Sequence, residues 1–465
     1  MSSDRPRVLV LGLDSVPPSL LFDRFRPLMP HVDALLRRST YGTLRSTDPP
    51  ITVPAWAVMF SGVDPGTLGL YGFRHRRPGS YGENYLPTSR TALEPMLWDR
   101  LSRAGKRVCV IGMPPGYPPP SVNGVYVSDF LTPAGAGTFV SPASLQREVD
   151  AAAGGYEFDV TFRAEDRERI GAQLLTLTHK HFAVARHLWA REPWDFFALH
   201  EIGPDRLHHT FWKYFDPGHP RFEPNDRFRG VVEEYYRALD REIGLVLADV
   251  PPGVRVLLLS DHGSQAMQGA FCINEWLIRQ GYLAVRGPRP PVGTPLEKVD
   301  VDWSRTRAWG AGGYYARIFY NLRGREPNGQ LAPDQIPAFQ AELTRALESV
   351  RRPDGHALGA DVRDPRTAYR EVRGDAPDLM VYFGDVAWRS AGTLGHDSLF
   401  LAENDTGPDD AVHSFDGIYS ISDPRQGVGS RGPTEQILDV GPTLASLLGL
   451  ELPARMQGHV IERFR

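Results

Sequence analysis

Three runs of apolar residues along the chain end in polar or charged side chains. They are residues 7–15, 194–205 and 254–263, and each places four or more apolar residues next to one another. A run without polar alternation is typical of a strand that is buried on both faces of a parallel sheet. A fourth run, residues 106–120, ends in a proline-rich segment. We expect the ends of these strands to frame one edge of a sheet.

Segments with apolar residues three and four positions apart lie between these runs. Residues 29–39, 94–106 and 231–250 have this spacing, and Gly105 is placed to end the second segment. Such spacing predicts amphipathic helices. Because strands and helices alternate, the predicted fold class is α/β.

The pattern changes after about residue 265. Residues 316–324 and 378–385 are predicted strands, and a long amphipathic helix is expected over residues 333–352. This part of the chain is predicted to form a smaller α+β subdomain, residues 266–395, inserted into a core made of residues 1–265 and 396–465. A closing helix is expected over residues 436–450.

The composition excludes several classes of protein. The chain has 41% hydrophobic and 23% charged residues with a formal net charge of -4, so it lacks the basic surplus expected of a protein that binds nucleic-acid polymers. No apolar stretch approaches the length of about 18 residues that predicts a membrane span. The two cysteines, Cys109 and Cys272, exclude a disulfide framework, and a reducing, cytoplasmic setting is expected.

Carboxylates and imidazoles follow the predicted strands. Each one alone has a simple structural explanation; Asp14, for instance, could cap the next helix. As a set they have the ligand chemistry of Zn²⁺, and the spacing of four between Asp205 and His209 puts both on one face of a helix. Six such groups suit two metal ions better than one. The set is Asp14, Asp205, His209, Asp261, His262 and His413.

A threonine lies between prolines in the segment DPPITVPAWAVMFSG, residues 48–62. Two metal ions about 4 Å apart can support an in-line displacement at phosphorus. Thr52 could be the nucleophile, because a nearby dication can hold a hydroxyl as an alkoxide. If a helix begins at Pro54, its free N–H groups would favour a phosphate bound beside Thr52.

Taken in order along the chain, these residues resemble the alkaline phosphatase superfamily. The chain is most similar to a phosphohydrolase branch close to the type I phosphodiesterase and nucleotide pyrophosphatase family. The resemblance covers nearly the whole chain. The matching segments are VLGLDS, TVPAWAVMFSGVDPGTLGLYGF, GPDRLHHTFWKYFD, LLLSDHG, YNLRGREPNG, HSFDGIYSIS and ILDVGPTLASLLGL.

The resemblance implies a fold and a mechanism. The fold would be a three-layer α/β/α sandwich around a mixed, mostly parallel sheet. The activity would be hydrolysis of a small phosphate ester or nucleotide through a phosphothreonine on Thr52, with zinc, or alternatively manganese, as the metal. Asp205, His209 and His413 would bind one ion. The second would be bound by Asp14, Thr52, Asp261 and His262.

Some positions differ from the family pattern. The family's His-Gly pair and its later asparagine are replaced here by Leu68-Gly69 and Phe73, and the sulfatase motif is absent. His208 and His396 are the rivals of His209 and His413. A phosphotransferase or phosphosugar mutase of the same superfamily, or a binding protein that kept the fold, are the alternatives. Candidate substrate contacts are Val53, Phe73, Arg74, Arg323 and Arg325.

Overall fold

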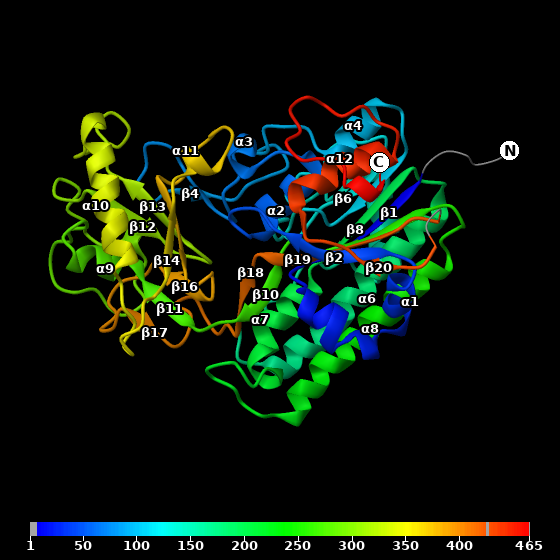
Figure 1. The fold of residues 1–465 in the computed structure, drawn as a ribbon, viewed down its shortest axis with the longest axis horizontal. Coiled ribbons are helices and arrows are strands. Elements are labelled where there is room, and N and C mark those ends of the chain that lie inside the picture. Colours follow the sequence, from blue (N-terminus) through cyan, green and yellow to red (C-terminus); the bar gives the residue numbers. More distant parts are fainter. Residues whose placement is uncertain (1–6, 425–426, 465) are drawn as a thin grey trace.

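The fold is given by a computed structural model, which describes residues 7–424 and 427–464. A large mixed sheet forms its centre, with helices on both faces (Figure 1). The strand order is β20-β2-β19-β9-β1-β8-β5-β6-β7, and β21 pairs with β2. In that order the bounds are Ser430–Arg431, Thr40–Arg45, Asp416–Ser422, Arg255–Leu259, Val8–Leu13, Phe196–Glu201, Val108–Ile111, Gly124–Val127 and Val140–Ser141, with β21 at Glu435–Gln436.

The four predicted strands lie side by side at the centre of this sheet. β1 pairs in parallel with β8 and β9, and β5 pairs in parallel with β8 and β6. β19 is antiparallel to both β9 and β2, which makes the sheet mixed. The predicted α/β class is therefore confirmed.

Strand β1 explains why the apolar runs show no alternation. Leu9, Leu11 and Leu13 face one hydrophobic core, whereas Val8 and Val10 face the other. Successive side chains of a strand point to opposite faces, so a strand covered on both sides must be apolar at every position. The three-layer arrangement follows from this burial.

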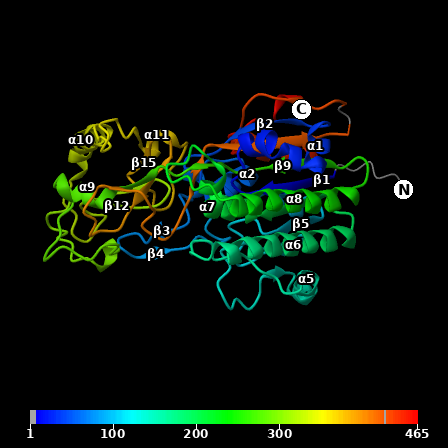
Figure 2. The same cartoon turned by 90° about the horizontal axis from the view of Figure 1, so that it is seen from below.

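Helices complete the two outer layers (Figure 2). The first core is covered by α1 (Pro30–Leu36), α6 (Arg167–Arg191), α7 (Gly203–Phe215) and α8 (Asp226–Ala248). The second is covered by α2 (Thr52–Ser61), α4 (Leu97–Arg103) and α12 (Val440–Leu447). Shorter elements are α3 (Pro65–Leu68), α5 (Gln146–Ala153), β3 (His75–Arg76) and β4 (Asn84–Tyr85).

A second sheet forms a separate lobe beside the first (Figure 1). Its order is β12-β13-β15-β16-β11-β17, with β14 paired to β15. Its strands run from Gly269 to Leu401, which overlaps the predicted insertion; we keep residues 266–395 as the proposed bounds. The elements are β11 (Gly269–Cys272), α9 (Ile273–Arg279), β12 (Ala308–Ala311), β13 (Ala316–Tyr320), α10 (Ile336–Glu348), β14 (Ala360–Arg363), α11 (Pro365–Ala368), β15 (Leu379–Phe383), β16 (Trp388–Ala391) and β17 (Phe400–Leu401).

A two-stranded ribbon adjoins the main sheet, because its strands follow β9 and precede β19 along the chain. Strands β10 (Gly263–Ala266) and β18 (Ala411–Ser414) pair antiparallel, with Ser264 opposite His413. Within the described residues, no helix combines the length and apolarity needed to cross a bilayer.

Candidate active site

The candidate residues meet where the central parallel strands end. Asp14 follows β1 directly, and Asp261 follows β9 after one residue. The helix after β8 is α7, which carries Asp205 in its first turn and His209 one turn later. Register therefore brings together side chains that are more than two hundred residues apart, as expected for the carboxyl edge of a parallel sheet.

Helix α2 begins at Thr52, two residues before the start at Pro54 that was considered from the sequence. Ile51 is extended, with φ -128° and ψ 134°, and precedes the first helical residue. Proline is compatible with the first turn of a helix because it lacks only an N–H that would have no helical partner there. Thr52 thus stands at the helix N-terminus, with its side chain in the site.

The hydroxyl of Thr52 lies against one group of metal-type side chains. Its Oγ1 is 3.4 Å from Asp14 Oδ1 and 3.2 Å from His262 Nε2. His262 Nε2 also lies 3.1 Å from Asp261 Oδ2 and 3.7 Å from Asp14 Oδ1. All four side chains are buried. We call these four residues the Asp14 end of the site.

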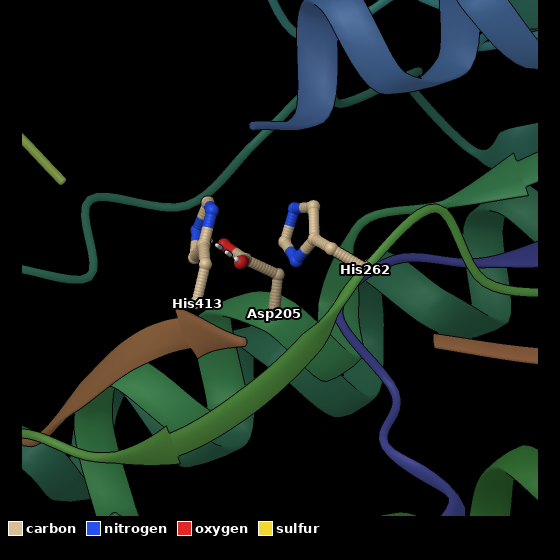
Figure 3. Close-up of side chains that lie close together, drawn as sticks. All are labelled: Asp205, His262 and His413. Atoms are coloured by element: carbon tan, nitrogen blue, oxygen red, sulfur yellow. Dashed lines mark ion pairs between the residues drawn. The ribbon is translucent and has the colours of Figure 1, made fainter. Parts of the chain in front are cut away.

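A second group forms what we call the Asp205 end: Asp205, His209 and His413. Asp205 Oδ1 lies 3.4 Å from His209 Nε2 and 3.5 Å from His413 Nε2. The imidazole rings of His413 and His262 stack at 3.8 Å, with the Asp205 carboxylate beside them (Figure 3). The two ends are therefore adjacent.

Two sets of three side chains have ligand atoms close enough to share an ion. Asp14, Asp261 and His262 form one, and Asp205, His262 and His413 form the other, with all ligand atoms of a set within 4.8 Å of one another. His262 belongs to both. His209 is in neither set, although its Nε2 faces Asp205 Oδ1.

Buried atoms without hydrogen bonds test whether the site suits a cation. Asp205 Oδ1, Asp261 Oδ2 and His413 Nε2 are buried and make no hydrogen bond within the described part of the chain. Buried polar atoms are usually paired, because an unpaired one costs about 1–3 kcal/mol. Two carboxylate oxygens and an imidazole nitrogen are donors that Zn²⁺ accepts. The residues present therefore fit a divalent metal.

Burial keeps two imidazoles in the neutral form that binds metals. It lowers the pKa of His262 to about 3, helped by the neighbouring His413, and lowers the pKa of His413 to about 4. Burial and the Asp14 charge raise the pKa of Asp261 well above its usual range. A buried carboxylate beside another negative charge resists ionisation, so the surroundings of Asp261 favour a cation.

At His209 and Asp205, the neighbouring charges outweigh burial in setting the pKa. Burial opposes a charge on His209, but the adjacent Asp409 carboxylate and Asp205 raise its pKa well above its usual range. Burial likewise opposes ionisation of Asp205, yet His209 and Arg206 hold its pKa well below its usual range. The carboxylates of Asp205 and Asp409 therefore stabilise positive charge at this end of the site.

Asp14 has two partners that the sequence analysis did not identify. Trp56 Nε1 donates to Asp14 Oδ2 at 2.9 Å, and His200 Nε2 lies 2.7 Å from the same oxygen. Trp56 follows Thr52 by one helical turn, so both reach Asp14 from one face of α2. Gly12 makes room for this, since a Cβ there would lie 2.6 Å from the indole.

Charged residues support the Asp205 end, and they too were missed. Arg206 Nη1 donates to Asp205 Oδ2 at 2.7 Å and leaves Oδ1 facing the site. Asp409 Oδ1 lies 2.6 Å from His209 Nδ1, which turns Nε2 toward Asp205. Arg389 and Arg163 in turn pair with Asp409. The contact between Asp409 and His209 spans 200 residues, so no local signal could reveal it.

The rival histidines point elsewhere. His208 Nε2 lies 2.8 Å from the Tyr236 hydroxyl, and its Nδ1 lies 3.0 Å from Ser264 Oγ. His396 lies against the second lobe, where its Nε2 lies 2.8 Å from Thr393 Oγ1. By contrast, His413 faces Asp205.

The predicted substrate contacts have different surroundings. Val53 is buried in the first turn of α2, and Phe73 is half-buried with its ring 6.3 Å from that of Tyr314. Arg74 and Arg323 are exposed. Arg325 is held by ion pairs with other side chains of the second lobe, namely Asp378 and Glu326.

With the site in place, comparisons with known proteins define the class. Residues 8–416 match the family described as type I phosphodiesterase / nucleotide pyrophosphatase. The chain is a phosphoryl-transfer hydrolase of the alkaline phosphatase superfamily. It belongs to the type I phosphodiesterase / nucleotide pyrophosphatase family. No curated protein sequence matches the chain significantly.

A solved structure has the same fold. It is the crystal structure of phosphonoacetate hydrolase from Sinorhizobium meliloti 1021 in complex with phosphonoformate. The TM-score is 0.62 at 15% sequence identity, and the match covers 96% of this chain and 95% of that chain. At this identity the likeness establishes the fold, which confirms the predicted alkaline phosphatase-like architecture.

Proposed function

We propose that this chain hydrolyses a small phosphate ester through a phosphothreonine on Thr52. The observation that carries the proposal is the position of Thr52 Oγ1, within 3.5 Å of both Asp14 Oδ1 and His262 Nε2 at the start of α2. A buried hydroxyl among metal-type ligands has the surroundings that an activated nucleophile needs.

Two divalent ions, zinc or alternatively manganese, would be held by the residues of the two ends. Asp205, His209 and His413 would bind one of them. When bound, such ions stabilise a deprotonated hydroxyl and neutralise phosphoryl oxygens. The second set of ligands is Asp14, Thr52, Asp261 and His262.

The residues of the chain then have separate roles in two displacements. Thr52 Oγ1 forms a bond to phosphorus, while the bond to the leaving oxygen breaks and its electron pair stays on that oxygen. The N–H groups of Thr52 and Val53 would donate to a phosphoryl oxygen, because the first amides of a helix lack helical partners and Pro54 has no N–H. A water oxygen then replaces Thr52 on phosphorus and frees the hydroxyl.

Of the other predicted substrate contacts, Phe73 is the best placed to meet the leaving group. Its half-buried ring lies near Tyr314 and Phe130, at 6.3 and 6.2 Å between centroids. Arg74 and Arg323 remain candidates for longer-range attraction of an anionic substrate, since both are exposed. Arg325 is the weakest candidate because Asp378 and Glu326 already engage its guanidinium.

Three substitutions at Thr52 test the nucleophile. Thr52→Ala and the isosteric Thr52→Val should abolish turnover of the ester that the wild type cleaves, while the melting temperature and metal content stay near wild type. Thr52→Ser should keep measurable activity because it retains a hydroxyl. Wild-type turnover by Thr52→Val would remove Thr52 from the mechanism.

Metal analysis tests the ligand sets. His413→Ala should lose one ion per chain by elemental analysis, and His396→Ala, the matched control, should lose none. Chelation with EDTA should inactivate the wild type, and Zn²⁺ or Mn²⁺ should restore it. Full activity of a demonstrably metal-free preparation would overturn the metal part of the proposal.

A substrate panel narrows the reaction. It should contain p-nitrophenyl phosphate, bis-p-nitrophenyl phosphate, a set of phosphorylated metabolites, and phosphonoacetate as the compound named for the structural neighbour. Free phosphate, or a phosphomonoester from a diester, is the expected product. Transfer of the phosphoryl group to an added alcohol in preference to water would favour the phosphotransferase alternative.

A further inference from the structure

A tyrosine from the second lobe reaches into the site. Tyr314 lies in the connection between β12 and β13 and is 8% exposed. Its hydroxyl lies 3.1 Å from His209 Nε2, and its ring stacks on His413 at 3.7 Å. The lobe that carries Tyr314 therefore contributes directly to the Asp205 end.

The backbone around Tyr314 is built to hold it there. Gly313 N donates to Ser390 O at 2.8 Å, and Ser390 N donates to Gly313 O at 2.9 Å, which ties this connection to β16. Gly312 passes so close to Gly392 that a Cβ would lie 2.5 Å from Gly392 N. This close approach accounts for a glycine at position 312.

Tyr314 and His262 lie on opposite faces of the His413 ring. Both rings stack on His413 at less than 4 Å with interplanar angles near 20°, and one ring can take two such partners only on its two faces. Thr52 Oγ1 contacts His262 Nε2. The Tyr314 hydroxyl thus belongs to the side of the site away from Thr52.

That side is where a leaving group must depart. In an in-line displacement the attacking and leaving oxygens lie on opposite sides of phosphorus. If His209 Nε2 binds a cation, this nitrogen is no longer a hydrogen-bond partner of Tyr314, and the hydroxyl hydrogen is left for another acceptor. Arg163 Nη2 donates to the Tyr314 oxygen at 3.4 Å, and Arg389 lies 4.4 Å from the ring centroid, so two positively charged side chains contact this tyrosine.

We propose that Tyr314 is a catalytic residue that donates a hydrogen bond to the oxygen leaving phosphorus. As the bond from Thr52 Oγ1 to phosphorus forms, the electron pair of the breaking bond passes to the leaving oxygen. The Tyr314 hydroxyl stabilises this charge and keeps its own proton, and the released alkoxide takes a proton from water. The proposal rests on the proposed function of the same site.

Leaving groups of graded basicity test this role. We would measure kcat/KM for aryl phosphate esters from dinitrophenol to unsubstituted phenol, using the ester type that the wild type cleaves. Tyr314→Phe keeps the stacked ring and removes the hydroxyl. It should lower kcat/KM about 100-fold for the phenyl ester, the loss typical of one oxyanion donor, and little for the dinitrophenyl ester, whose leaving oxygen needs less stabilisation.

Tyr315→Phe is the matched control, because its hydroxyl donates to Tyr71 O at 2.7 Å and is engaged outside the two groups of ligand side chains. It should reproduce the wild-type dependence on leaving group. The metal content of Tyr314→Phe should equal that of the wild type. An equal loss for every leaving group, or loss of an ion from Tyr314→Phe, would overturn the proposal.

The two proposals fail in different ways. Wild-type turnover by Thr52→Val would refute the covalent mechanism, while the dependence of Tyr314→Phe on leaving group would still report on hydrogen bonding to the departing oxygen. Conversely, an unchanged dependence in Tyr314→Phe would refute the role of Tyr314 and leave the Thr52 result intact.

Discussion

The two ends of the site are supported by different chemistry. At the Asp14 end, the carboxylate is held by the indole of Trp56 and the imidazole of His200, both from the core of the main sheet. At the Asp205 end, the supporting groups are charged: Arg206 on Asp205, and Asp409 on His209. The second lobe adds Arg389 to this network.

This difference predicts which end of the site is more sensitive to substitution. Removing one member of a buried charge network leaves an uncompensated charge, at a cost of about 3–5 kcal/mol. Losing one hydrogen bond to a charged group costs about 1.5–3 kcal/mol. Substitutions at the Asp205 end should therefore have larger effects than those at the Asp14 end.

The largest effect is expected for Arg206→Gln. Arg206 pairs with Asp159 at 2.6 Å as well as with Asp205, so its loss removes a guanidinium that two carboxylates share. We expect the free energy of unfolding to fall by about 3–5 kcal/mol in urea denaturation. Arg206→Lys keeps the charge and should lose less. If the free energy of unfolding falls by less than it does for a surface substitution, Arg206 does not stabilise a charge network.

An intermediate effect is expected for Asp409→Asn. Asp409 fixes the orientation of His209 through Nδ1, and loss of such a partner typically weakens metal binding about 10–100-fold. Competition with a zinc chelator would measure this. Asp410→Asn is the control, since Asp410 is neighbouring and buried but its carboxylate pairs with Arg167. Equal weakening by both variants would show that Asp409 acts only through general packing.

The smallest effect is expected for Trp56→Phe. It removes the donor to Asp14 Oδ2 but leaves His200 on the same oxygen, so stability should fall by about 1.5 kcal/mol, the lower limit for a hydrogen bond to a charged group. Trp98→Phe, in the same hydrophobic core, controls for the lost indole volume. If Trp56→Phe destabilises the chain as much as Arg206→Gln does, the contrast between the two ends is wrong.

The residues that could be predicted from the sequence lie at the ends of the central strands or at helical spacing from one another. The central strands β1, β8 and β9 were predictable, because burial on both faces imposes continuous apolar runs. The residues after these strands could then be expected to meet, as Asp14 and Asp261 do. His209 was found from its spacing to Asp205 on a helix.

The supporting residues could not be found in this way. Tyr314 and Asp409 reach the site from segments whose position depends on how the two lobes pack, and their local sequences carry no matching signal. His200 lies near the end of the apolar strand β8, and apart from its residue type nothing in the sequence indicated that it contacts Asp14. A helix start at Pro54 was considered from the sequence, whereas α2 begins two residues earlier, at Thr52.

The central claim is a covalent displacement at Thr52, and a trapped intermediate tests it most directly. The wild type would be mixed with its ester, quenched in acid within one turnover, digested and examined by mass spectrometry, with Thr52→Val treated in parallel. We predict one phosphoryl group on the wild-type peptide that contains Thr52 and none on the variant. An unmodified peptide in the wild type, together with undiminished turnover by Thr52→Val, would contradict the account.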